Sequence, residues 1–329
     1  MWASRLPYLG RAQRALEREV PRKGGVNKGC LEAILAGSPR PAGLHFSGKK
    51  CKKMKINVAT WNVRTMLDKD YDKRPERRTT LIAKELHRYN IDIVALQETR
   101  LEGQGQVQEK EYTSFWSGRV DGRREAGVAF AISNKFASKL TSLPTGLSES
   151  IILLRTPIGN DHDCYLSVIS FYAPTMMYPD EEKEAFYEKL AEVVDRVPME
   201  DKLLILGDFY AIVGNAHTTY DGTLGKFGKG KKNSNGELML QFCTQRGLSI
   251  ANTFFQQPDM NFFTWRHPRS KHLHLIDYVV TRKSCMPEIL STKAIRGAEC
   301  STYHYMVWSQ LRLQLIFPRR KDPSNTPGG

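Results

Sequence analysis

The chain has 329 residues, of which 40% are hydrophobic and 26% charged, a balance typical of a folded globular protein. No apolar run approaches the roughly 18 residues that a membrane-spanning helix needs, so we expect no membrane partner. The net charge of +14 is concentrated at the N-terminus, because residues 1–55 hold 13 Lys or Arg and 3 Asp or Glu, a net charge of +10. Such a basic segment suits contact with a polyanion such as nucleic acid, and a merely solvated tail is the alternative.

Residues 1–54 are rich in Gly, Pro, Arg and Lys and show little periodicity, so we expect a disordered basic arm. Its Arg-rich, acid-poor opening is faintly similar to a mitochondrial presequence, and the run Lys49–Lys55 could serve nuclear import. The six cysteines are scattered with no CxxC pair, which indicates reduced thiols in a reducing compartment. We therefore expect a nuclear or cytoplasmic location, with mitochondria as the minor alternative.

Periodic structure begins at Ile56. Helical spacing of apolar residues predicts helices over Glu76–Tyr89, Pro179–Val197 and about Gly236–Gln245. Apolar or alternating runs predict strands over Ile56–Trp61, Ile91–Leu96, Tyr112–Trp116, Gly127–Ile132, Ile151–Leu154, Tyr165–Tyr172, Lys202–Leu206, Leu248–Asn252, Phe262–Trp265, Leu275–Thr281 and Tyr305–Leu315. Because strands outnumber helices and several adjacent strands lack an intervening helix, the pattern favours a layered α+β fold over a doubly wound parallel sheet. With no internal linker visible, we expect one domain over residues 55–316 and a disordered tail over 317–329.

Three predicted strands end in a small polar or acidic cluster. These clusters are Thr60–Asn62 (TWN), Leu96–Thr99 (LQET) and Gly207–Tyr210 (GDFY). A carboxylate such as Glu98 or Asp208 at the end of a buried strand is costly unless it meets a metal ion, a cation or hydrogen-bond donors. Each cluster alone could be structural, with Asp208 capping a loop, but their repetition in one domain favours a common site.

A further acid, Asp277, lies within the apolar run His274–Val280 (HLIDYVV). An acid flanked by apolar residues should not be buried without a partner, so its position predicts a cationic or imidazole neighbour. His304 begins another apolar run and is the natural candidate. The alternative is that His304 only packs in the core and that Asp277 anchors a loop.

The motifs TWN, QET, SFYAP, GDF, IDY and HYMV occur in the order of the endonuclease/exonuclease/phosphatase superfamily, and the chain resembles that family over residues 56–315. DNase I and the abasic-site endonucleases share this fold. The segments WNVRTM, HPRSKH and FCTQRGLSIANTFF are similar, more narrowly, to endonuclease domains of LINE-type retrotransposons and their host-derived relatives. The resemblance implies a four-layer α/β sandwich of two packed, mostly antiparallel sheets flanked by helices, with the active site at one end.

The resemblance also implies roles for individual residues. Glu98 would be the main ligand of Mg²⁺ or Mn²⁺, a hard cation that suits phosphate chemistry, and Asn62 would lie beside it. Tyr172, in SFYAP, would contact the scissile phosphate, and Asp208 would orient or deprotonate the attacking water. No small-molecule cofactor is expected.

The remaining implied roles concern the phosphate and the DNA. His304 would hold a phosphate oxygen, with Asp277 fixing its tautomer and favouring its charged form. Trp265 and Arg269 would lie near the DNA-facing rim, although such a tryptophan is about as often part of the core. The reaction would be in-line attack of water on a phosphodiester that leaves a 3′ hydroxyl.

Two positions depart from the family pattern. Tyr210 stands where Gly-Asp-x-Asn has its amide, and loss of one such donor alone is worth roughly 10²–10³ in rate. Tyr303 replaces the acid that precedes the family histidine, which removes a negative charge and an oxygen ligand. Arg64, where abasic-site repair enzymes carry an acid, matches the retrotransposon branch.

The sequence thus predicts a monomeric, metal-dependent DNA endonuclease that acts at abasic or target sites, weakened by Tyr210 and Tyr303. The alternative is a catalytically impaired, domesticated copy that binds nucleic acid or protein, and a retroelement remnant without a selected role is a third possibility. Within the fold, DNA repair enzymes, deadenylases, sphingomyelinases and inositol-phosphate phosphatases are other options. The narrower motifs favour the DNA-acting branch.

Overall fold

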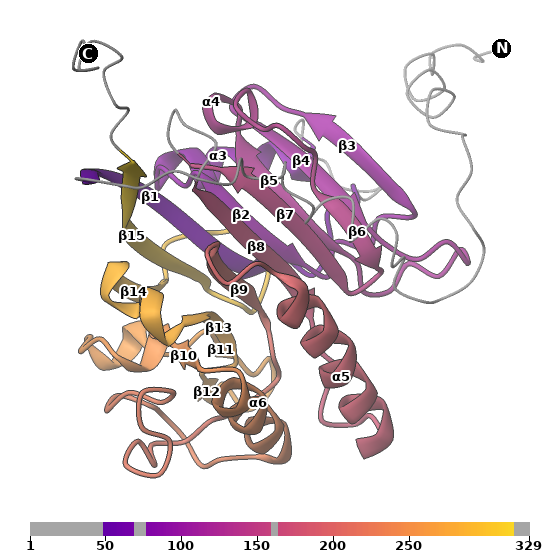
Figure 1. Ribbon diagram of the computed structural model, residues 1–329. Helices are drawn as coiled ribbons and strands as arrows, with labels where there is room; N and C mark the ends of the chain where they lie inside the picture. The colour runs from indigo at the N-terminus through magenta and orange to yellow at the C-terminus, as the bar shows by residue number, and fades with distance from the viewer. Residues whose placement is uncertain (1–48, 69–76, 159–163, 319–329) are drawn as a thin grey trace, which may run out of the picture.

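The computed structural model describes residues 49–68, 77–158 and 164–318. They form two stacked β-sheets with helices on their outer faces (Figure 1). Most of the expected basic arm and of the expected tail lie outside the described residues. Among the helices of the described part of the chain, none has the length and apolar character to cross a membrane.

The larger sheet has seven strands in the order β14-β15-β1-β2-β5-β4-β3. They are β1 (Lys49–Asn62), β2 (Ile93–Gln97), β3 (Gln104–Gln108), β4 (Tyr112–Ser117), β5 (Val128–Ser133), β14 (Ile289–Ile295) and β15 (Met306–Pro318). The smaller sheet has the order β10-β13-β9-β8-β7-β6. Its strands are β6 (Thr145–Ser148), β7 (Ile151–Pro157), β8 (Tyr165–Tyr172), β9 (Lys202–Asp208), β10 (Leu248–Ile250) and β13 (Asp277–Arg282). A separate hairpin pairs β11 (Trp265–Arg266) with β12 (Leu273–His274).

The central strands bury apolar side chains on both faces. In β9, Leu204 and Leu206 pack between the two sheets, whereas Leu203 and Ile205 pack beneath the helices, as the two-residue period of a strand requires. In β1, Trp61 lies on the outer face of the larger sheet, away from the smaller sheet. Three apolar layers therefore separate four layers of structure.

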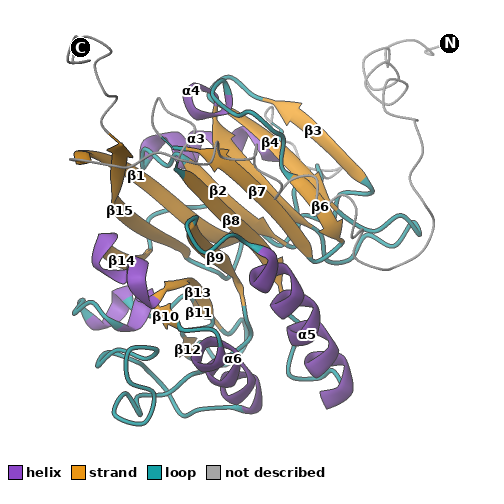
Figure 2. Ribbon diagram, in the orientation of Figure 1, coloured by secondary structure: helices purple, strands orange, loops and turns teal. Residues whose placement is uncertain are grey.

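Helices cover the outer faces of the sheets. α5 (Asp180–Arg196) and α6 (Ser234–Gln245) pack on the smaller sheet, and α3 (Arg78–Arg88) packs on the larger one. Figure 2 shows the long irregular segment that joins β9 to α6. The short helices are α4 (Asn134–Ala137), η2 (Ala251–Thr253), η3 (Asp259–Asn261) and η4 (Lys283–Glu288). The predicted α+β fold and the implied four-layer sandwich are both confirmed.

Several predicted bounds are wrong. β1 begins at Lys49, seven residues before the expected strand, and pairs with β15 as far as Pro318. Backbone hydrogen bonds extend this ladder regardless of the lysine-rich sequence. The strand expected over Phe262–Trp265 is reduced to β11, and four strands (β3, β6, β12 and β14) were not predicted. β3 alternates between exposed and half-buried polar residues at a sheet edge and so lacks an apolar pattern.

Gly207 permits the close approach of β8 and β9. A Cβ atom at this position would lie 2.4 Å from the backbone oxygen of Phe171, a contact that no side-chain rotation relieves. We expect Gly207→Ala to lower the free energy of unfolding by about 1–3 kcal/mol, measured by urea denaturation. The control is Glu184→Ala on the exposed part of α5, which should change it by less than about 0.5 kcal/mol. An alanine at 207 as stable as glycine would contradict this packing.

Candidate active site

Strand pairing brings the predicted polar clusters to one end of the sandwich. β1 and β2 are parallel, so Asn62 lies beside Gln97 and next to Glu98. β8 and β9 are also parallel, and Tyr172 pairs with Asp208. Because parallel strands have their carboxyl ends at the same edge, polar residues that follow these strands meet there.

Asp277 reaches the same place from the opposite direction. β13 runs antiparallel to β9, and its first residue, Asp277, pairs with Asp208. Asp277 therefore opens its strand, whereas the sequence placed it within an apolar strand. His304 lies just before β15, and its backbone forms an isolated antiparallel bridge with Trp265.

Asn62 joins the two sheets at this end. Its Nδ2 donates to Glu98 Oε1 at 2.7 Å and to Asp208 Oδ2 at 3.0 Å. Its Oδ1 accepts from the backbone N–H of Arg64 at 3.0 Å. With both ends of the amide bonded and the side chain fully buried, Asn62 holds the two carboxylates at a defined separation.

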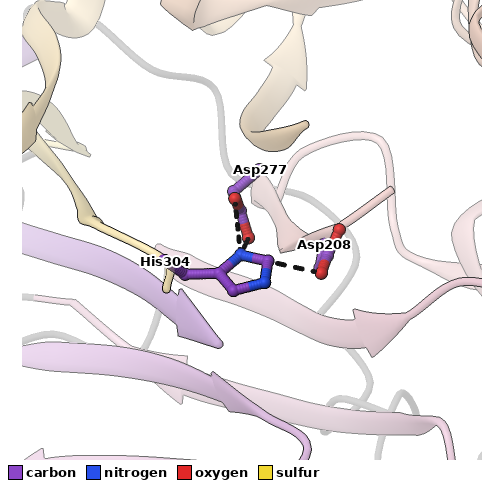
Figure 3. Close-up of side chains that lie close together, drawn as sticks. All are labelled: Asp208, Asp277 and His304. Carbon is purple, nitrogen blue, oxygen red and sulfur yellow. Dashed lines mark hydrogen bonds and ion pairs between the residues drawn. The ribbon is translucent and has the colours of Figure 1, made fainter. Parts of the chain in front are cut away.

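The His304 imidazole lies between two carboxylates, as Figure 3 shows. Its Nδ1 is 3.1 Å from Asp277 Oδ2 and 3.9 Å from Asp208 Oδ2. Burial disfavours the charge on the ring, but the negative charge and hydrogen bond of Asp277, with Asp208 and Glu98 beyond, outweigh it and raise the pKa of His304. The partner predicted for Asp277 is confirmed. Because Asp277 engages Nδ1, the Nε2 nitrogen of the ring does not take part in this contact.

The surroundings of Asp208 favour the neutral form of its carboxyl group. Burial and the negative charge of Asp277 raise the pKa of Asp208 to about 8, against the opposing effects of His304, the Asn62 amide and the Tyr210 N–H. A carboxyl group with a pKa in this range exchanges its proton near neutral pH, as a general base requires.

Glu98 is held by donors from three elements. Its Oε1 accepts from the Asn62 amide, from the Tyr172 hydroxyl at 3.0 Å and from the Tyr210 hydroxyl at 3.2 Å. The two phenol oxygens lie 3.0 Å apart. Arg100 Nη2 is 3.6 Å from the other carboxylate oxygen, Oε2. The Glu98 side chain is 14% exposed, so it is partly open to solvent.

The residues present fit a divalent cation. Glu98 offers hard oxygen donors, the type that Mg²⁺ and Mn²⁺ prefer, and the Asn62 amide lies beside it with its nitrogen toward the carboxylate. Behind them, ligand atoms of Asp208, Asp277 and His304 all lie within 4.8 Å of one another. Their carboxylate oxygens are of the type that divalent cations such as Mg²⁺ and Mn²⁺ bind.

Tyr210 and Tyr303, the two departures from the family pattern, occupy different environments. Tyr210 is half-buried and its hydroxyl reaches Glu98. Tyr303 is 43% exposed and its ring lies under the guanidinium of Arg64, with 4.9 Å between Cζ and the ring centroid. Only the first of the two phenols thus contacts the carboxylates of the site.

The predicted rim residues lie on the β11–β12 hairpin beside His304. The Trp265 ring is half-buried and its centroid is 6.1 Å from that of His304. Arg269 is exposed in the turn of the hairpin. Trp265 therefore borders the site, whereas Arg269 lies further along the hairpin, in its turn.

Sequence reasoning missed the residues that support the charged pair. Thr264 Oγ1 accepts from the backbone N–H groups of Ile276 and Asp277, both at 3.0 Å. Trp61 Nε1 donates to the backbone oxygen of His304 at 3.1 Å. Thr302 Oγ1 accepts from His304 N at 3.2 Å. Thr264, a buried polar residue within the apolar stretch FFTW, could have been noticed, but nothing local identified its partner.

A family model described as endonuclease/exonuclease/phosphatase matches residues 59–289, more than half of the chain. The chain is similar to craniofacial development protein 2 of Bos taurus, at 30% identity over 277 residues, covering 83% of this chain and 44% of that protein. The Tragulus javanicus protein of the same name is 31% identical over 275 residues, with 83% and 45% covered. The chain thus spans somewhat less than half the length of these curated relatives.

Solved structures share the fold. The endonuclease domain of TRAS1, a telomere-specific non-LTR retrotransposon, has a TM-score of 0.53 at 16% identity, covering 78% of this chain and 99% of that domain. The Xenopus laevis APE2 catalytic domain has a TM-score of 0.55 at 17% identity over 81% and 94% of the two chains. The AP endonuclease LMAP from Leishmania major has a TM-score of 0.56 at 12% identity over 92% and 99%. At these identities the likeness concerns the fold alone.

Proposed function

This chain belongs to the endonuclease/exonuclease/phosphatase family, and from that premise we propose that it is a divalent-metal-dependent phosphodiester hydrolase that cuts DNA. The observation that carries the proposal is the meeting of Asn62, Glu98, Asp208 and the Asp277–His304 pair at one end of the sandwich. The carboxylates, the amide and the imidazole lie there within hydrogen-bonding distance of one another's neighbours. Such a set can activate water and neutralise a developing negative charge.

The residues take distinct roles in this proposal. Asp208 accepts a proton from water as the water oxygen bonds to phosphorus and the bond from phosphorus to the 3′ oxygen breaks, and the departing 3′ oxygen takes a proton from solvent to become the 3′ hydroxyl. The protonated His304 donates from Nε2 to a phosphate oxygen, because its Nδ1 is engaged by Asp277. The hydroxyl of Tyr172, which lies against Glu98, contacts the same phosphate.

A divalent cation, Mg²⁺ or Mn²⁺, would supply charge neutralisation at the phosphate oxygens. Glu98 would be its main protein ligand, with Asn62 beside it. Asn62 bonds to Glu98 and to Asp208, so its amide orients both carboxylates toward the same substrate.

DNA is the proposed substrate. The neighbours that share the fold include a retrotransposon endonuclease domain and an AP endonuclease. Exposed arginines also flank the site, with Arg64 two residues beyond Asn62 and Arg266 and Arg269 on the hairpin beside His304. Cationic side chains attract phosphate backbones. Nicking at abasic or target sites, by a monomer, is the activity that we propose.

Tyr210 and Tyr303 favour a second candidate, an impaired copy that binds nucleic acid or protein. Both residues stand where the family pattern has a polar group of another kind, and Tyr210 contacts Glu98 directly. On this proposal turnover is slow, or absent, while the fold and the basic rim are retained.

We expect the full chain to nick supercoiled plasmid and an abasic oligonucleotide slowly, and only with Mg²⁺ or Mn²⁺ present. Gel assays with and without a chelator measure this, because the charge on the phosphate must be neutralised by a cation. Glu98→Gln should reduce the metal-dependent rate by at least about tenfold, since a neutral amide is a poorer ligand.

Nicking that survives the chelator, or that is unchanged in Glu98→Gln, would contradict the proposed metal-dependent mechanism. Metal-dependent binding of DNA without any nicking would instead support the second candidate.

A further inference from the structure

Tyr210 is held in one position by its own backbone. Its φ angle of 47° lies in the left-handed region, which a tyrosine adopts only when its surroundings impose it. Its N–H donates to Asp208 Oδ1 at 3.1 Å, and its carbonyl oxygen accepts from Asn233 Nδ2 at 3.2 Å. The preceding residue, Phe209, is fully buried. The main chain therefore aims the Tyr210 side chain at a fixed point.

That point is the carboxylate of Glu98. The Tyr210 hydroxyl lies 3.2 Å from Glu98 Oε1 and 3.0 Å from the Tyr172 hydroxyl, and the two rings meet edge to face with their centroids 5.7 Å apart. A carboxylate oxygen only accepts hydrogen bonds, so the Tyr210 hydroxyl acts toward Glu98 as the donor.

With Tyr210 included, protein donors occupy the lone-pair directions of Glu98 Oε1. It faces three of them, the Asn62 amide and the two phenols, whereas a carboxylate oxygen offers about two lone-pair directions. A cation that bound this oxygen would compete for the same lone pairs. Asn62 and Tyr172 were assigned to the site from the family motifs, so Tyr210 is the donor that distinguishes this chain.

We propose that the Tyr210 hydroxyl competes with the divalent cation for Glu98, so that this residue sets the metal affinity of the site. The inference rests on the proposed function, because it takes Glu98 as the metal ligand. It differs from the simple loss of an amide at position 210: an absent donor slows turnover, but a competing donor weakens metal binding even without DNA. The two effects are separable by replacing the phenol with a ring that lacks the hydroxyl.

The test is calorimetric titration of the metal-free, full-length chain with MnCl₂. A hydrogen bond to a charged group is strong enough to change an affinity by roughly 10- to 100-fold, so Tyr210→Phe should bind Mn²⁺ tighter by about that factor. Tyr303→Phe is the matched control, because it removes a phenol oxygen at the rim whose ring faces Arg64; its affinity should equal that of wild type. Adding Glu98→Gln to Tyr210→Phe should abolish the gain.

An affinity of Tyr210→Phe equal to or weaker than wild type overturns the inference, and so does a gain that persists without Glu98. Circular dichroism of the metal-free chains checks folding, and Tyr210→Leu, which also lacks the phenol and adds no polar group, gives the same comparison if the phenylalanine variant fails to fold. Tighter binding through Glu98 with no DNA cut by any variant would refute the proposed function and leave the inference standing. Metal-dependent cutting with unchanged Mn²⁺ affinity in Tyr210→Phe would refute the inference and leave the proposed function standing.

Discussion

Replacement of His304 by alanine is expected to abolish detectable nicking of supercoiled plasmid at saturating Mn²⁺. Removing a positioned acid or base typically costs about 10²–10⁴ in rate. Here the change also leaves the buried carboxylates of Asp208 and Asp277 without the imidazole between them, and it removes the charge that opposes the raised pKa of Asp208. The measurement is the initial rate of conversion of supercoiled to open-circular DNA.

His87→Ala is the matched control for that experiment. His87 is exposed in the last turn of α3, so its loss should leave the rate unchanged. Asp277→Asn tests the pair from the other side: it keeps the imidazole but removes the negative charge that raises the pKa of His304. If His304→Ala nicks as fast as the wild-type chain, His304 has no catalytic role.

The double change Tyr210→Asn/Tyr303→Asp is expected to raise the nicking rate by at least about 10²-fold. The asparagine restores an amide donor, worth roughly 10²–10³ in comparable sites, and removes the phenol that contacts Glu98. The aspartate adds a carboxylate at the residue before His304, and the ligand environment of a metal changes its affinity by about 10–100-fold. The assay uses supercoiled plasmid and an abasic oligonucleotide side by side.

The two single variants are needed beside the double one, because changes within one site do not combine additively. A wild-type rate equal to that of the double variant would show that Tyr210 and Tyr303 do not impair the site. If even the double variant is inert at saturating Mn²⁺, the chain is not an endonuclease under these conditions, and the second candidate function becomes the better account.

Tyr210 illustrates how the two experiments complement each other. Tyr210→Phe removes only the hydroxyl, so it reports on competition for Glu98. Tyr210→Asn removes the hydroxyl and adds the amide, so it reports on competition and on the missing donor together. The difference between the two rates therefore isolates what the family amide contributes.

The sequence was sufficient for the fold class because the two relevant patterns are local. Lys202–Leu206 reads as a strand buried on both faces, and Pro179–Val197 reads as an amphipathic helix, since each shows its own period within a few residues. The structure has β9 and α5 at these places. Edge strands such as β3 were missed, because an exposed edge buries too little to leave an apolar pattern.

The sequence also predicted one contact between residues far apart in the chain. An acid inside the apolar run at Asp277 required a partner, and the His304 imidazole is that partner at 3.1 Å. This inference needed only the cost of burying a charge, which holds whatever the fold.

What only the tertiary structure decided is where each side chain points and what it contacts. The sequence showed Tyr210 as a substitution in a motif, but not that its hydroxyl would lie against Glu98, 112 residues away along the chain, while the exposed Tyr303 ring packs under Arg64. Nor did it show that Thr264 would accept from the backbone of Asp277. These contacts depend on the parallel registers of β1 with β2 and β8 with β9 and on the left-handed turn at Tyr210. Such features arise from long-range packing, because no local period encodes which strand ends will meet.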